Sequence, residues 1–263
     1  MAEKKQHTIV SAETGKPVAA KAKTVQAADP SSNSNPKSLR IVAWVLWILA
    51  FACEVIAILA YVDKIHITFL PTLTAIIILL VLDFALVVAG AQFWKKANHI
   101  DPVSEANKLK FWLWNNMGVI VCCFAFIPFI IIALTDKNAD PKTKKVASIV
   151  AAVALVLGVG LSYDWNPVSE EGLEQATQTL ANTQVYWTQY GKKYHTHEDC
   201  QYLNRTDVLT AGSIDDAVAA GRSTICSACA KKDNLTVGEN GAVTGTVKAA
   251  EEVVEAVTEE PAA

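Results

Sequence analysis

Outside its long apolar runs, the sequence contains no hydrolase triad, no nucleotide-binding loop and no paired-carboxylate signature. Each of these patterns marks a class of enzyme, so nothing here supports catalysis. Charge is also scarce, because Asp, Glu, Lys and Arg make up only 19% of the 263 residues. Hydrophobic residues make up 52% and are concentrated between Leu39 and Leu161. This composition is typical of a membrane protein with soluble ends.

Four apolar runs fill most of the region 39–162, with ranges 39–62, 68–94, 111–134 and 146–162. A helix needs about 20 residues to cross a hydrocarbon layer of about 30 Å, and each run meets or approaches that length. Trp, Tyr and Lys stand at or just beyond the run ends, where interfacial anchors are expected. The pattern predicts a mainly α fold, a bundle of four transmembrane helices with the lipid bilayer as its partner.

Two acidic residues, Glu54 and Asp83, stand near the centres of the first two runs. Ionisable side chains in a bilayer are costly, so they usually face protein or water. Two interpretations stay open: the carboxyl groups pack as protonated, hydrogen-bonded groups, or they line a proton or cation path. Cys53, Cys122 and Cys123 lie in apolar surroundings, and we expect them to pack as small hydrophobic side chains.

Polar segments flank the apolar region. Residues 1–38 are predicted to be a disordered basic tail and residues 233–263 a disordered acidic tail, with 163–184 an acidic helical spacer. Residues 1–40 contain seven Lys or Arg and three acids, whereas residues 233–263 contain seven acids and one Lys. The positive-inside rule then predicts a cytoplasmic N-terminus.

The side of the membrane that holds the C-terminal region depends on the third run. Four lysines in the loop 135–145 favour a cytoplasmic loop, which would require the third run to be re-entrant. Residues 117–134 carry no charge, however, and backbone that turns back in lipid must find hydrogen-bond partners there. We therefore expect four full spans and a cytoplasmic C-terminal region, where reducing conditions keep thiols free.

Residues 185–232 carry the recognisable chemistry. His195 precedes Cys200, and the pair Cys226-x-x-Cys229 follows about 25 residues later. A Cys-x-x-Cys pair with a distant Cys and His supplies the four donors of a tetrahedral structural zinc site. A segment this short buries little core, so a metal ion would supply stability that it otherwise lacks. We expect a small α+β zinc module here.

Other interpretations of these residues are a Cys226–Cys229 disulfide, a redox-active pair and inert buried thiols. Three cysteines fit a complete disulfide set poorly, and no thioredoxin-like βαβ pattern surrounds the pair. His197 competes with His195 for the fourth ligand position.

The module also contains the run Val-Tyr-Trp-Thr, Gly191, Tyr194-His195, Asp199-Cys200, Ala217, Ala220-Gly221 and the final Cys-x-x-Cys. This pattern resembles the small module related to the metal-binding domain of Ada-type DNA-repair proteins. The resemblance implies that His195, Cys200, Cys226 and Cys229 are the ligands, and it favours His195 over His197. Residues 36–167 are similar to bacterial multi-pass membrane proteins that carry this module at the C-terminus, which implies a bacterial cell membrane and names no reaction.

We therefore expect a non-enzymatic integral membrane protein whose structural zinc module mediates interaction with a protein partner. Three thiolates and one imidazole close a tetrahedron and leave no position for a reactive water. The alternative is a sensor or transporter that responds to metal or thiol-reactive signals, with Glu54 and Asp83 in the membrane path. Nucleic acid is not an expected partner, because residues 185–232 contain six Lys or Arg against five acids.

Overall fold

The computed structural model describes residues 7–17, 35–66 and 68–245. The chain divides into two compact units. One, called here the helix bundle, contains residues 36–97 and 108–165. The other, called the C-terminal unit, contains the described part of residues 1–35 together with residues 98–107 and 166–245.

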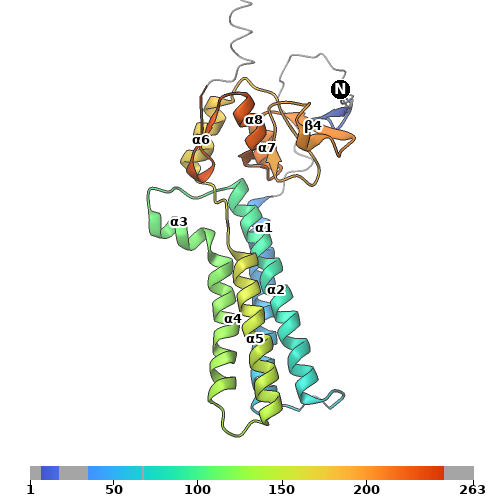
Figure 1. The fold of residues 1–263 in the computed structure, drawn as a ribbon, viewed down its shortest axis with the longest axis vertical. Coiled ribbons are helices and arrows are strands. Elements are labelled where there is room, and N and C mark those ends of the chain that lie inside the picture. The colour runs from blue at the N-terminus through green and yellow to red at the C-terminus, as the bar shows by residue number, and fades with distance from the viewer. Residues whose placement is uncertain (1–6, 18–34, 67, 246–263) are drawn as a thin grey trace, which may run out of the picture. The chain divides into compact units, whose positions relative to one another are not determined.

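The helix bundle is built from five helices (Figure 1): α1 (Pro36–Tyr61), α2 (Thr72–Ile100), α3 (Lys108–Asn115), α4 (Met117–Thr135) and α5 (Pro141–Ser162). Four of them, α1, α2, α4 and α5, are long and apolar enough to cross a membrane. The four membrane-length helices predicted from the apolar runs are therefore confirmed, although their ends differ from the predicted ranges.

The third apolar run, predicted as one helix over 111–134, is divided into α3 and α4. The side-chain amides of Asn115 and Asn116 donate hydrogen bonds to the backbone carbonyls of Phe111 and Trp112, at 3.0 and 2.9 Å. Such local side-chain bonds compete with a continuous helix. The prediction of one continuous helix was wrong, and only α4, the uncharged part of the run, has membrane length.

The fourth helix begins five residues before the predicted range. The Asp140 carboxylate accepts a hydrogen bond from the Thr143 N–H at 2.9 Å, and Pro141 occupies the first turn. An Asp cap followed by proline is a strong helix start, so the polar turn with its lysines joins the apolar run in one helix.

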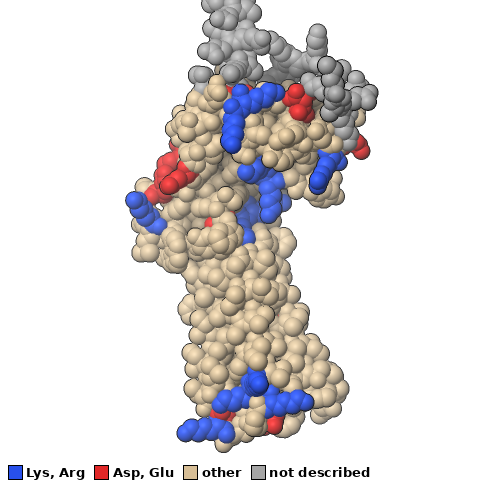
Figure 2. Space-filling model, in the orientation of Figure 1, with Lys and Arg blue, Asp and Glu red and all other residues tan. Residues whose placement is uncertain are grey.

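Alanines make up about half of the buried core of the bundle, beside larger side chains such as Phe126 and Leu80, and many other large apolar side chains face outward. Its buried core contains eight alanines: Ala50, Ala57, Ala60, Ala125, Ala133, Ala147, Ala151 and Ala154. Large apolar side chains such as Ile48, Phe124 and Val156 are 65%, 67% and 71% exposed. On the face seen in Figure 2, the middle of the bundle carries no charged residue. An apolar outer surface around a small-residue interior is typical of helices packed in lipid.

A cluster of tryptophans joins α1, α2 and α3. The rings of Trp47 and Trp94 lie 5.5 Å apart, and those of Trp94 and Trp114 lie 5.1 Å apart. Trp47 Nε1 donates to the carbonyl of Val87 at 3.2 Å. Gly90 permits this contact, because a Cβ atom there would lie 2.4 Å from Trp47 Nε1.

The C-terminal unit contains three small sheets. The first has the order β1-β4-β2, from β1 (Thr8–Ser11), β4 (Val208–Gly212) and β2 (Val185–Trp187), with β1 parallel and β2 antiparallel to β4. The second pairs β3 (Lys193–Tyr194) with β5 (Thr224–Ile225) in parallel, and the third pairs β6 (Thr236–Val237) with β7 (Val243–Thr244). Its helices are α6 (Glu170–Thr179), α7 (Ile214–Ala219), α8 (Ser227–Lys232) and the 3₁₀ turns η1 (Gln201–Leu203) and η2 (Glu239–Gly241).

The prediction of disordered tails was wrong for the residues that the structure describes. Residues 8–11 form β1, because the β-forming run Thr-Ile-Val-Ser pairs with the edge of β4 in the register Thr8↔Val208. Residues 236–244 form β6 and β7, which Val243 and Leu235 anchor in the core. The remaining tail residues, 1–6, 18–34 and 246–263, lie outside the described residues.

The predicted spacer 163–184 does contain a helix, α6, but this helix packs into the C-terminal unit and is not a separate linker. The Ser169 hydroxyl caps α6 by accepting from the Gly172 N–H at 3.0 Å. Ala176 and Leu180 are buried in the same core as the strands, so α6 is part of the C-terminal unit. The Glu105 N–H, in the segment 98–107, donates to the Glu171 carboxylate at 2.9 Å. The unit is thus larger than the predicted 185–232 and draws on three separate stretches of chain.

Candidate metal centre

The parallel pairing of β3 and β5 brings two of the candidate metal donors together, the His195 ring and the Cys226 thiol. Tyr194 pairs with Ile225, and the Cys226 N–H donates to the Tyr194 carbonyl at 2.8 Å. Because parallel strands end at the same edge, the next residues, His195 and Cys226, leave the sheet side by side. His195 is also held to β2, since His195 and Tyr186 exchange two backbone hydrogen bonds of 2.7 and 2.8 Å.

Cys229 and Cys200 are supplied by two tight turns. Cys226 occupies the N-cap position of α8, and Cys229 lies in the first turn of that helix. The Ala230 N–H donates to the Cys226 carbonyl at 2.9 Å and holds this turn closed. Cys200 precedes η1, where the Leu203 N–H donates to its carbonyl at 2.8 Å. Short turns of this kind fix the cysteine Cβ directions with few residues.

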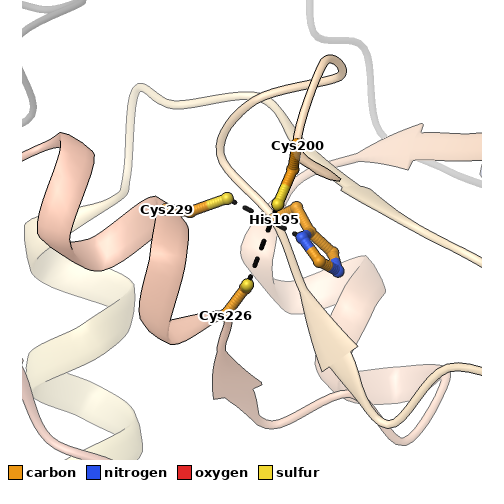
Figure 3. A group of neighbouring side chains, drawn as sticks. All are labelled: His195, Cys200, Cys226 and Cys229. Carbon is orange, nitrogen blue, oxygen red and sulfur yellow. Dashed lines mark hydrogen bonds between the residues drawn. The ribbon is translucent and has the colours of Figure 1, made fainter. Parts of the chain in front are cut away.

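All four predicted ligands meet in one buried cluster (Figure 3). One donor atom from each of His195, Cys200, Cys226 and Cys229 lies within 4.8 Å of the other three. The Cys200 and Cys226 sulfurs are 3.9 Å apart, and His195 Nδ1 lies 3.7 Å from the Cys229 sulfur. Sulfurs at about 2.3 Å from a tetrahedral centre are separated by about 3.8 Å, so the cluster has the size that such an ion requires. The cluster could hold a metal ion.

Burial shapes the protonation of these donors in the absence of metal. It lowers the pKa of His195 to about 4, so the ring is neutral and keeps a lone pair for a metal. Burial raises the pKa of the Cys200 thiol to about 12. Burial also raises the pKa of Cys229, while the backbone N–H groups of His197 and Thr196 act in the opposite direction. Burial disfavours the ionised form of the Cys200 and Cys229 thiols, so both are well suited to a cation that takes the place of their protons.

A buried aspartate that the sequence analysis did not identify, Asp233, forms hydrogen bonds to two residues beside His195 and to the backbone of Cys229. Asp233 is 1% exposed and accepts hydrogen bonds from the Thr196 hydroxyl at 2.5 Å and His197 Nε2 at 2.7 Å. Its own N–H donates to the Cys229 carbonyl at 2.9 Å. Asp233 therefore ties the loop after His195 to the end of α8. No sequence spacing indicated this role, because it depends on a contact across 37 residues.

The two competing histidines have separate positions. His195 contributes to the donor cluster, whereas His197 turns its ring to Asp233 and is 23% exposed. In a regular strand, residues two apart such as His195 and His197 would point to the same side. The chain bends directly after His195, so the two rings point in different directions. The preference for His195 thus agrees with the geometry of the cluster.

The predicted intramembrane residues Glu54 and Asp83 lie far from this cluster in the sequence, in the helix bundle. They are 2% and 0% exposed, and their side chains interact with one another across α1 and α2. The three other cysteines, Cys53, Cys122 and Cys123, are free thiols of the bundle, of which Cys122 is buried.

The chain was compared with models of protein families, with curated proteins and with solved structures. None of the three comparisons found a match.

Proposed function

We propose that this chain is a non-enzymatic membrane protein whose C-terminal unit is held together by a structural zinc ion and serves as a site of protein interaction. The observation that carries the proposal is the closed set of three cysteines and one histidine, all buried. Zinc favours this donor set in tetrahedral geometry, and four protein ligands leave no open position for a substrate or a reactive water.

The positions of the ligands in the chain support a structural role. His195 follows β3, Cys200 opens η1, and the other two cysteines begin α8. An ion bound to all four would join three loops that otherwise share a small core of Leu203, Leu209 and the cysteines themselves. In a unit with so little apolar core near the site, metal binding energy contributes directly to folding.

The contacts inside the C-terminal unit also support a topology with four spans. β1 precedes the first membrane-length helix, the segment 98–107 follows the second, and residues 166–245 follow the fourth. All three belong to one compact unit, joined by the β1–β4 pairing and by the Glu105–Glu171 hydrogen bond. Segments that pair with one another must lie on one side of a membrane, which requires an even number of crossings between them. We propose the cytoplasm, where cysteines remain reduced.

The interaction role rests on the surface of the C-terminal unit. Tyr190, in the loop between β2 and β3, is 89% exposed, and Tyr202, in η1 next to Cys200, is 64% exposed. Tyrosine is enriched in protein interfaces. Residues 185–232 contain six Lys or Arg against five acids, which is no strong excess of positive charge. We therefore propose a protein partner and not a nucleic acid.

Elemental analysis of the purified full-length protein tests the zinc proposal. After reducing purification without added metal, we expect one zinc per chain. The Cys226→Ser, Cys229→Ser double variant should contain none, while the Cys53→Ser, Cys123→Ser variant, which alters only bundle cysteines, should retain one. A wild-type protein that is folded and free of zinc after this treatment would refute the proposal.

A further inference from the structure

The carboxyl groups of Glu54 and Asp83 form a buried acidic pair inside the helix bundle. Glu54 comes from α1 and Asp83 from α2, and their side chains interact electrostatically. Both are almost completely buried, at 2% and 0% exposed. None of the four carboxyl oxygens has a hydrogen bond of ordinary geometry to a described residue. Two acidic groups of this kind need a ligand that compensates their charge.

The groups around the pair do not supply a counter-charge. Among the described residues, Cys53 of α1 and Cys122 of α4 are the titratable side chains besides Glu54 that interact with Asp83. The Cys122 thiol donates to the Leu155 carbonyl of α5, at 3.8 Å. On α5, Lys144 lies in the first turns and donates to the backbone carbonyl of Asp136 at 2.8 Å. Two carboxylates that share an apolar site cannot both remain ionised, so at least one proton is the simplest ligand.

A cavity lies at one end of the helix bundle, and one of its lining residues, Tyr61, belongs to the same helix as Glu54. It has a volume of about 390 Å³ and lies between the ends of α1 and α4. Its lining includes the polar residues Asp63, Thr135, Asp136 and Asn138 together with Tyr61. A cavity of this size with polar lining groups can hold water.

An aromatic contact links the lining of the cavity to the acidic pair. Tyr61, in the cavity wall, lies two helical turns from Glu54 on the same face of α1, about 10 Å along the axis. Its ring contacts Phe129 of α4, with centroids 5.5 Å apart, and its hydroxyl donates to the Ala133 carbonyl at 3.1 Å. The backbone of Phe129 in turn interacts with the Glu54 carboxyl group. Tyr61 thus belongs to the cavity lining, and Phe129 contacts Tyr61 on one side and interacts with Glu54 on the other.

We propose that Glu54 and Asp83 form a proton-binding site that exchanges with the cavity through the Tyr61–Phe129 contact. In the protonated state the pair shares one proton and carries a single negative charge, or binds two protons and is neutral. A proton that leaves passes to water in the cavity as hydronium and leaves a carboxylate behind. A metal ion fits less well, because no third Asp, Glu, His or Cys donor of the described bundle joins the pair within ligand distance.

Infrared spectroscopy of the full-length protein in a detergent without carbonyl groups tests the site. We expect an absorption band of protonated carboxyl groups at neutral pH that weakens as the pH is raised. The Glu54→Gln, Asp83→Asn double variant should lose this band, and the Asp63→Asn, Asp136→Asn variant of the cavity mouth should keep it. Absence of the band in the wild type, or a band that does not change with pH, would overturn the proposal whatever the variants do. Loss of the band on addition of sodium or potassium chloride would also overturn it, in favour of a monovalent cation.

Transfer to heavy water tests the route. The carboxyl band shifts when the proton is replaced by deuterium, and we expect this exchange to be faster in Tyr61→Ala than in the wild type. Tyr163→Ala, which removes a tyrosine just beyond the C-terminus of α5, is the matched control and should exchange at the wild-type rate. Equal exchange in both variants would show that the proton does not pass the Tyr61–Phe129 contact. Zinc content, measured on the same samples, reports separately on the function proposed above.

Discussion

His197 Nε2 lies 2.7 Å from a carboxylate oxygen of Asp233, a contact that joins the loop beyond β3 to the end of α8. The same carboxylate accepts from the Thr196 hydroxyl, and the Asp233 N–H binds the Cys229 carbonyl. One buried side chain thus holds the loops of two metal donors. Groups that orient metal ligands are costly to remove even when they never touch the ion.

Asp233→Ala should weaken both the fold of the C-terminal unit and its metal affinity. The Thr196 hydroxyl loses its buried acceptor, which costs about 1–3 kcal/mol of unfolding free energy. We expect zinc affinity to fall by about 10- to 100-fold, as for other residues that hold metal ligands in place. Competition with a coloured chelator measures the affinity. Asp215→Ala, an acidic residue in the first turn of α7, is the control and should bind zinc normally.

His195→Ala and His197→Ala should differ sharply. Loss of His195 removes a metal donor. Zinc affinity should therefore fall by more than the roughly 10- to 100-fold that is expected when a residue that only orients a ligand is removed. Loss of His197 removes one of three hydrogen bonds around Asp233 and should have a smaller effect. Chelator competition on both variants decides the matter, and stronger loss in His197→Ala would show that the wrong histidine was assigned.

Removal of zinc should unfold the C-terminal unit while the helix bundle remains folded. The four donors join β3, η1 and α8, whereas the bundle has its own alanine-rich core. We expect a chelator to make residues 185–245 sensitive to limited proteolysis and to leave the helical circular dichroism of the bundle largely intact. Re-addition of zinc should restore protection. If protection persists without metal, the cluster does not stabilise the unit.

Gly90→Ala should destabilise the helix bundle, although alanine is the better helix former by about 1 kcal/mol. The new Cβ would lie 2.4 Å from Trp47 Nε1, so Trp47 must move and lose its 3.2 Å hydrogen bond to the Val87 carbonyl. Gly160→Ala is a matched control in α5, since a Cβ there meets nothing within 4 Å. Thermal unfolding in detergent should show a lower midpoint for Gly90→Ala and an unchanged or higher one for Gly160→Ala.

The N-terminus and the C-terminal unit should lie on the same side of the membrane, and the loop 135–145 on the other. The pairing of β1 with β4 requires the N-terminus and the C-terminal unit to share one side. Loop 135–145 lies on the other side if α4 and α5 each cross the membrane once. Reporters that are active only in the cytoplasm, fused before Met1 and after Lys232, should give equal signals. A reporter inserted at Asn138 should give the opposite result. Unequal signals at the two ends would contradict four full spans.

The parts of the fold set by local composition could be predicted from sequence. Long apolar runs dictate helices whatever their neighbours, as α1, α2, α4 and α5 show. The Cys and His donors of the candidate metal cluster were also identified in advance, because a tetrahedral ion constrains ligand spacing, while the resemblance to Ada-type modules favoured His195 over His197. Thr8–Ser11 could not be assigned in this way, since a four-residue strand is stable only beside the edge that pairs with it. Asp233 was missed for a similar reason, because its partners lie 36 and 37 residues away.

The pairing of β1 with β4 also determines the order of events during synthesis. Thr8 leaves the ribosome long before Val208, its partner in the sheet, and the four membrane-length helices lie between them. At about 5–20 residues per second, the first strand waits on the order of ten seconds or more for its partner. The β1–β4 sheet of the C-terminal unit can therefore be completed only after all four membrane-length helices have been synthesised.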